Sequence, residues 1–181
     1  MLSPQTLSEA DRRLVAAWAA DCAEHVLGLF ELEAPDDDRP RDAISRARAF
    51  ARGELTAAGE IRRRFVAGRA ARVVSSPAAI AAARSAAQAS GVAHMGAHAL
   101  GAAAYAAAAA GLRAPDRPTA VDEELHWQLL QLSVEARTAL ARLPRLGEDS
   151  SGPLGPGLLA SGILGSIIRT LQTEIRPSIG P

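Results

Sequence analysis

Runs of alanine constrain the fold of this chain more than any other feature. The stretch GAAAYAAAAAG at residues 101–111 is the longest of them, and alanine makes up more than a fifth of the sequence. Signals for helices dominate, whereas the alternating β-branched and aromatic residues typical of strands are missing. Aromatic residues account for only 3% of the chain, which argues against a β-rich core. We therefore predict an all-α fold, a single compact bundle of about six to eight alanine-rich helices.

Capping signals indicate where these helices begin. Ser8, with Asp11 three positions later, favours a first helix over residues 8–32. Asp38 is the expected N-cap of a second helix, with Pro40 in its first turn and Gly53 at its end. The remaining helices are expected over residues 56–74, from Ser76 and Pro77 onward, within 92–111, from Thr119 onward and, capped by Ser133, over 133–143. Gly91 either ends the helix that begins at Pro77 or lies within one longer helix.

The composition changes at Gly147, where GEDSSGPLGPG reads as a flexible linker. We therefore expect a helical domain over residues 1–146, a usual size for one hydrophobic core. Residues 147–181 are expected to form a Gly/Pro/Ser linker and then either a short amphipathic helix, docked on the domain or on a partner, or a disordered tail.

Charge and cysteine content exclude several classes of protein. The 20 basic and 20 acidic residues cancel, so a nucleic-acid partner is not expected. The longest apolar run, GLLASGILGSII, is about half of the ~20 residues that a membrane span needs. Cys22 is the single cysteine and no secretory signal precedes it. These features predict a reduced, cytoplasmic protein that does not enter a membrane.

Two histidines four positions apart, His94 and His98, form the most conspicuous candidate site. If they lie in a helix, they share one face with Tyr105. Such spacing suits two ligands of one zinc ion, but a third ligand is needed and the glutamate of an HExxH motif is absent. We favour a hydrogen-bonded polar cluster without a metal or other cofactor. Candidates for the third ligand of the alternative metal site are Asp21, Cys22 and His25 from the first helix, and His126 is a fourth.

Two further groups of polar residues have a structural and a functional interpretation. Cys22 and His25 could form a thiol–imidazole pair, although a free cysteine more often serves as a small buried apolar residue. The segment DDDRPRD concentrates charge at the start of the second helix, where capping explains most of it. The functional alternative is an interaction surface, and its residues are Asp36, Asp37, Asp38, Arg39 and Arg41.

Several segments together resemble the Imm-5-like putative immunity proteins of bacterial polymorphic-toxin systems. They are DRRLVAAWAADCAEHVLGLFE, PDDDRPRDAISRARAFARGE, AHMGAHALGAAAYA and ELHWQLLQL, in that order. The resemblance extends over residues 10–143, with Phe50 in place of an expected tryptophan, and leaves out the tail after Gly147. It implies an all-helical protein that protects its own cell by binding a cognate toxin. It carries over no residue with an established chemical role.

We therefore predict that the protein neutralises a cognate toxin by steric occlusion and performs no catalysis. The first expected contact surface is the charged segment at residues 36–41. The second is a groove between helices lined by Asp21, Cys22, His25, His94, His98 and Tyr105. The rival hypothesis is a helical metalloprotein or hydrolase that uses His94 and His98 with His25 or Asp21. A third, a regulator that binds a small molecule, needs an apolar pocket, which close packing of alanine-rich helices disfavours.

Overall fold

The structure is a computed structural model, and it describes residues 3–63 and 66–176. All regular elements in these two ranges are helices, which confirms the all-α fold. Nine α-helices and one short 3-10 helix are found there, more than the six to eight predicted. They are α1 (Glu9–Glu31), α2 (Arg39–Ala51), α3 (Ala57–Arg63), α4 (Val66–Ala70), α5 (Pro77–Gly91), α6 (His98–Arg113), α7 (Ala120–Leu130), α8 (Val134–Ala141), η1 (Leu158–Ala160) and α9 (Gly162–Ile175).

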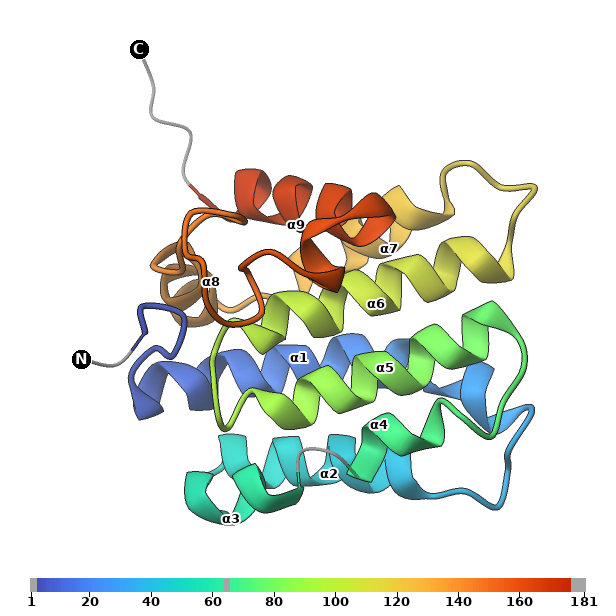
Figure 1. The fold of residues 1–181 in the computed structure, drawn as a ribbon, viewed down its shortest axis with the longest axis horizontal. Helices are drawn as coiled ribbons and strands as arrows, with labels where there is room; N and C mark the ends of the chain where they lie inside the picture. Colours follow the sequence, from blue (N-terminus) through green and yellow to red (C-terminus); the bar gives the residue numbers. More distant parts are fainter. Residues whose placement is uncertain (1–2, 64–65, 177–181) are drawn as a thin grey trace.

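Helices α1, α5 and α6 pack against one another and form the centre of the bundle. Figure 1 shows the remaining helices on two sides of this centre. Helices α2, α3 and α4 pack on the side of α1 and α5, while α7 and α9 pack on the side of α6. The fold therefore has a central layer of three helices, with α2, α3 and α4 packed on one side and α7 and α9 on the other.

The alanine runs allow the central helices to approach closely. From Ala99 to Ala107 every residue of α6 is buried. The Ser85 hydroxyl on α5 donates a hydrogen bond of 2.7 Å to the Ala102 carbonyl on α6. A side chain as short as serine reaches the neighbouring backbone only where the two helices are separated by small residues. The core therefore gains its cohesion from many close contacts rather than from a few large side chains.

Local capping signals predict the start of several helices correctly. The side chains of Ser8, Ser76 and Ser133 each accept a hydrogen bond from the backbone N–H three residues later, at 3.0 to 3.1 Å. Asp38 occupies the N-cap position of α2 as expected, but its side chain makes no capping bond. The neighbouring Asp37 accepts the Arg39 backbone N–H instead, at 3.2 Å.

Two predicted helices differ from those in the structure. The helix expected over 56–74 is found as α3 and α4, and residues 64–65 between them lie outside the described chain. The helix expected to contain both His94 and His98 begins only at His98. His94 lies in the turn that joins α5 to α6.

The turn between α5 and α6 is held by the N-terminal segment. The backbone N–H groups of Gly96 and Ala97 donate to the carbonyls of Thr6 and Gln5, both at 3.0 Å. These bonds compete with helix formation across the turn. The predicted stripe of His94, His98 and Tyr105 on one helix is therefore wrong, because a contact distant in sequence ends the helical pattern.

In the C-terminal segment, residues Gly162–Ile175 form helix α9. Helix α9 packs against α6 and α8 and buries Ile167, Ile168 and Leu171 in the same hydrophobic cluster as the central helices. The Gln172 amide donates to the Pro144 carbonyl at 2.8 Å and fixes the helix to the preceding loop. No helix in the described ranges is both long enough and apolar enough to span a membrane.

Candidate functional site

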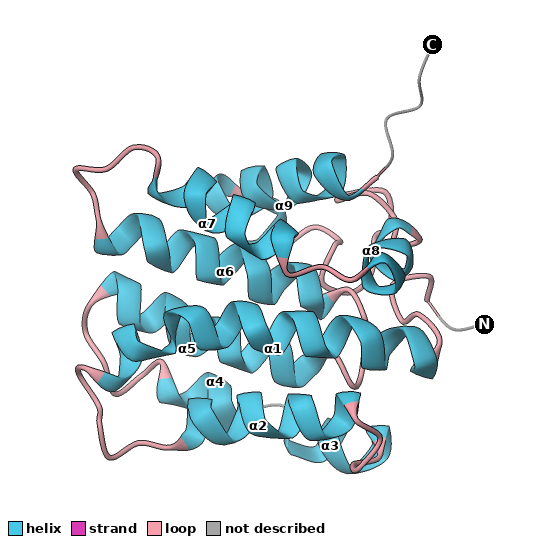
Figure 2. Cartoon of the chain, turned by 180° about the vertical axis from the view of Figure 1, so that it is seen from behind, coloured by secondary structure: helices cyan, strands magenta, loops and turns pink. Residues whose placement is uncertain are grey.

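A surface groove of about 470 Å³ lies between α1, α2 and α7. We call it the α1 groove, and Figure 2 shows α1 flanked by α2 and α7 on this side of the molecule. Polar side chains dominate its lining. They are Asp21, Glu24 and His25 from α1, Arg48 from α2, and Trp127 and Gln131 from the end of α7.

One stripe of α1 reaches the surface, although this helix is otherwise part of the core. Its members recur at three- and four-residue spacing, so they share one face of the helix. The opposite faces carry the buried Val15, Trp18, Cys22 and Val26. The exposed or half-buried members of the stripe are Leu14, Ala17, Asp21, Glu24, His25 and Gly28.

A chain of hydrogen bonds joins α7 to α1 beneath the groove. His25 Nδ1 donates to Glu124 Oε2 at 2.8 Å, and Gln128 Nε2 donates to the other oxygen of that carboxylate at 2.9 Å. The indole N–H of Trp18 donates to the Gln128 carbonyl at 2.8 Å. The His25 ring also stacks on Trp127, with ring centroids 3.7 Å apart. The carboxylate of Glu124, only 6% exposed, is thus bonded on both oxygens, as a buried charge requires.

Arg48 binds the two carboxylates on the α1 side of the groove. Its guanidinium donates to Asp21 Oδ1 at 2.8 Å and to Glu24 Oε2 at 2.5 Å. The hydrogen bond from Arg48 lowers the pKa of Glu24 below its ordinary value. The same carboxylates raise the pKa of Arg48. These charges are therefore fixed in place by partners within the protein.

Cys22 lies beneath the groove without lining it. Its side chain is completely buried. Burial, and then the negative charges of Glu124 and Asp21, raise the pKa of the thiol well above its ordinary value. Because the thiolate is the reactive form, this environment disfavours a nucleophilic role and matches the use of cysteine as a small apolar residue.

The charged segment at residues 36–41 leads from α1 into α2. Arg39 Nε donates to Asp37 Oδ1, and Arg41 Nε donates to Glu31 Oε1, both at 2.8 Å. The bond from Arg39 lowers the pKa of Asp37. Asp36 and Asp38 are exposed, and their side chains form no hydrogen bond or ion pair with the residues that the structure describes. The unpaired charge of this segment is therefore negative.

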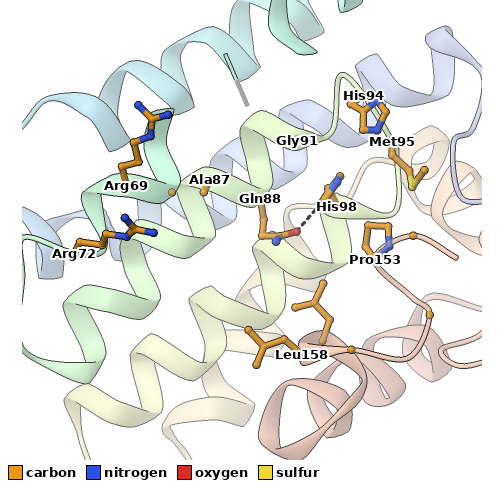
Figure 3. A pocket seen from close by; sticks show the side chains of 15 residues that line it. Arg69, Arg72, Ala87, Gln88, Gly91, His94, Met95, His98, Pro153 and Leu158 are labelled. Atoms are coloured by element: carbon orange, nitrogen blue, oxygen red, sulfur yellow. Dashed lines mark hydrogen bonds between the residues drawn. The ribbon is translucent and has the colours of Figure 1, made fainter. Parts of the chain in front are cut away.

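A second cavity, of about 830 Å³, lies on the opposite side of the central helices. We call it the His98 pocket, shown in Figure 3. Its walls come from α4, from the end of α5, from the α5–α6 turn and from the loop before η1. The side chains most relevant to its chemistry are Arg69, Arg72, Gln88, His94, His98 and Leu158.

The structure separates the residues that the sequence analysis grouped as one polar groove. Asp21 and His25 line the α1 groove, whereas His94 and His98 line the other cavity. Tyr105 is buried on α6 beneath Arg84, whose guanidinium carbon lies 5.9 Å from the ring centroid. The ligand set of the alternative metal site is therefore not brought together. Across the described ranges, no group of three or more His, Cys, Asp or Glu side chains is arranged to hold a metal ion.

Sequence reasoning missed most of the partners that define both cavities. Glu124 and Gln128 lie four positions apart on α7, and this spacing gave a usable signal for a shared helix face. Arg48 and Gln88 gave no such signal, since their partners lie on other helices, 27 and 10 residues away along the chain.

A family model described as Imm-5 like putative immunity protein matches residues 5–135. The chain belongs to this family. The match confirms the resemblance and contains every residue that lines the α1 groove, while residues 152–159 of the His98 pocket lie outside it. No curated protein and no solved structure matches the chain.

Proposed function

We propose that this protein binds a cognate toxin and neutralises it by covering the toxin's active cleft. The observation that carries the proposal is the family match over residues 5–135. The α1 groove and the charged segment at 36–41 both fall inside that range and both are open to a partner. A complex of ordinary size needs about 800 Å² per partner. The face proposed to supply this surface is built from α1, α2 and α7.

The charge on this face favours a toxin with a basic surface. Asp36 and Asp38 are exposed and unpaired within the described chain, whereas Arg39 and Arg41 are bound by carboxylates of the protein itself. Unpaired charges at the edge of an interface steer association and select the partner. Substitutions of the two aspartates therefore test recognition more cleanly than substitutions of the two arginines. Replacing Arg39 by an acidic residue, for example, would break its ion pair with Asp37 and place two carboxylates side by side.

The groove is preorganised for binding. The hydrogen bonds from His25 to Glu124 and from Trp18 to Gln128 hold α7 against α1, and Arg48 holds Asp21 and Glu24. Side chains that are already fixed lose little conformational freedom when a partner binds. This supports a rigid contact surface made of Trp127, His25 and Gln131 beside the steering aspartates.

The test is co-expression of the protein with each open reading frame that flanks its gene, with survival as the readout. We expect one neighbour to be toxic and the wild-type protein to rescue growth. The double variant Asp36→Lys/Asp38→Lys should slow association with the purified toxin roughly tenfold at low salt. A matched control reverses two exposed carboxylates on α8 and α9, Glu135→Lys/Glu174→Lys, and should bind like the wild type. Absence of any rescue would refute the proposed function, whereas equal losses in both double variants would refute only the proposed face.

A further inference from the structure

The His98 pocket carries a local excess of positive charge in a chain whose net charge is zero. Two guanidiniums, from Arg69 and Arg72, and two imidazoles, from His94 and His98, line it. No carboxylate belongs to the lining that the structure describes. A cavity with this set of groups attracts an anion.

The two arginines of the pocket differ from Arg48 of the α1 groove, because they have no partner among the residues that the structure describes. Their side chains form no hydrogen bond or ion pair within the described ranges. Elsewhere, arginines such as Arg46 and Arg48 bind carboxylates of the protein. Arg69 and Arg72 are both exposed and lie three residues apart, at and just beyond the end of α4. Their ten N–H donors are available to an external acceptor, and guanidiniums suit carboxylate and phosphate.

The polar wall of the pocket consists of Gln88 and His98, which pack closely against two glycines. His98 Nδ1 donates to Gln88 Oε1 at 2.7 Å, as Figure 3 shows. A Cβ added at Gly91 would lie 2.9 Å from His98 Cγ, and one added at Gly101 would lie 2.5 Å from Gln88 Oε1. Both glycines are therefore needed for this pair of side chains to sit where it does. The wall keeps its shape without a ligand.

The opposite wall is apolar. Pro153, Leu158 and Leu159 come from the loop before η1 and from η1 itself, and Met95 adds its thioether from the α5–α6 turn. Leu158 is 63% exposed, a large value for a leucine beside a cavity. Figure 3 shows the arginines on one side of the pocket and Pro153 and Leu158 on the other, with Gln88 and His98 between them.

We infer that the His98 pocket binds a small amphipathic anion, with a carboxylate or phosphate head at Arg69 and Arg72 and an apolar body against Leu158, Pro153 and Met95. The volume of about 830 Å³ is in the range of small-molecule sites, which combine apolar walls with a few polar groups. This inference does not depend on toxin binding, because the pocket shares no lining residue with the α1 groove.

Calorimetric titration of the full chain with four eight-carbon probes tests the chemistry of the ligand. Octanoate and octyl phosphate supply the two head groups, and the tighter of the two identifies the head that the site prefers. Octanol has the same body without charge, and octyltrimethylammonium has the opposite charge. We expect both anions to bind at least tenfold more tightly than octanol and the cation not to bind. Octanol binding as tightly as both anions, or neither anion binding, would overturn the inference.

Inorganic phosphate and acetate test the need for an apolar body. We expect each to bind at least tenfold more weakly than its octyl counterpart. Equal affinity would show a simple anion site and would contradict the amphipathic ligand.

Two double variants locate the site. Arg69→Gln/Arg72→Gln should weaken binding of the preferred anion about ten- to a hundredfold, the range expected for loss of charge-assisted hydrogen bonds. Arg113→Gln/Arg145→Gln removes two exposed arginines outside the pocket and should leave the dissociation constant unchanged. Leu158→Ser should weaken binding of the octyl compounds and not of acetate. Thermal unfolding of each variant checks that it folds. Equal affinities of the two double variants would place the anion elsewhere and refute the assignment.

Discussion

The α1 groove and the His98 pocket contain the same kinds of side chain and use them differently. In the groove, Arg48 is bound by Asp21 and Glu24, and His25 is bound by Glu124. In the pocket, by contrast, the guanidiniums of Arg69 and Arg72 bind nothing within the described chain. A paired arginine positions its neighbours, whereas an unpaired one remains available to a ligand. The type of residue alone therefore does not tell whether an arginine positions its neighbours or binds a ligand. Its hydrogen-bond partners within the protein do.

The largest expected effect comes from removing the indole that joins α1 to α7. Trp18 is 2% exposed and donates its N–H to the Gln128 carbonyl. Trp18→Ala should lower the free energy of unfolding by about 3–5 kcal/mol, because it leaves a large cavity and removes the hydrogen bond between the two helices. Urea unfolding measures the loss. Trp18→Phe keeps most of the packing and should cost less, so equal costs would show that packing does not hold this side of the molecule.

The glycines that shape the His98 pocket should give the next largest effect. Gly101→Ala places a methyl group against Gln88 and Leu159, and Gly91→Ala places one against His98. Gly91→Ala should destabilise the protein by about 1–3 kcal/mol, the usual cost of overpacking, because the methyl group meets the ring of His98. Gly101→Ala should cost less, because the closest atoms belong to the flexible end of Gln88. Gly28 is the matched control, since a Cβ there meets no atom within 4 Å. Gly28→Ala should stabilise the protein by about 0.5–1 kcal/mol. A loss of stability at Gly28 equal to that at Gly91 would contradict the close approach described for the pocket.

Reversal of the two exposed aspartates should change stability only slightly. Asp36→Lys/Asp38→Lys removes no hydrogen bond or ion pair of the described chain. It does place a cation at the N-cap of α2 beside Arg39, so it should lower the free energy of unfolding by about 1 kcal/mol. Thermal unfolding checks this expectation. A clearly larger loss in the free energy of unfolding would show that the two carboxylates stabilise the start of α2. In that case the double variant could not separate toxin recognition from folding.

The smallest effect concerns the titration of Glu24. Arg48 lowers the pKa of this carboxyl in the folded protein. The resulting stabilisation is present above the ordinary value of 4.5 and is lost as the pH falls through the lower folded pKa. Arg48→Gln should therefore raise the pKa of Glu24, as followed by NMR of the side-chain carboxyl carbon. The stability difference between variant and wild type should shrink as the solution is acidified. An unchanged pKa would show that Arg48 does not hold the groove's charges.

Features with local causes could be predicted from the sequence, and features with distant causes could not. The caps Ser8, Ser76 and Ser133 act within three residues, and each marks a helix start in the structure. The end of the helical pattern before His98 depends on Gln5 and Thr6, about ninety residues away along the chain.

The two cavities show the same limit. The bond from His25 to Glu124 joins positions 99 residues apart, so no spacing rule could pair them. Close packing of alanine-rich helices is expected to disfavour an apolar pocket, yet a cavity lies at His98. The central helices do pack closely there, but the cavity forms between them and a glycine-rich loop, where Gly152, Gly155 and Gly157 line it.

Amide hydrogen exchange of the toxin complex tests the central claim most directly, namely that the α1 groove and the segment at 36–41 form the toxin-binding face. We expect the toxin to slow exchange in residues 21–41 and 124–131 and to leave exchange in residues 69–98 and 152–159 unchanged. Protection confined to the His98 pocket, with none in α1 or at the start of α2, would contradict it.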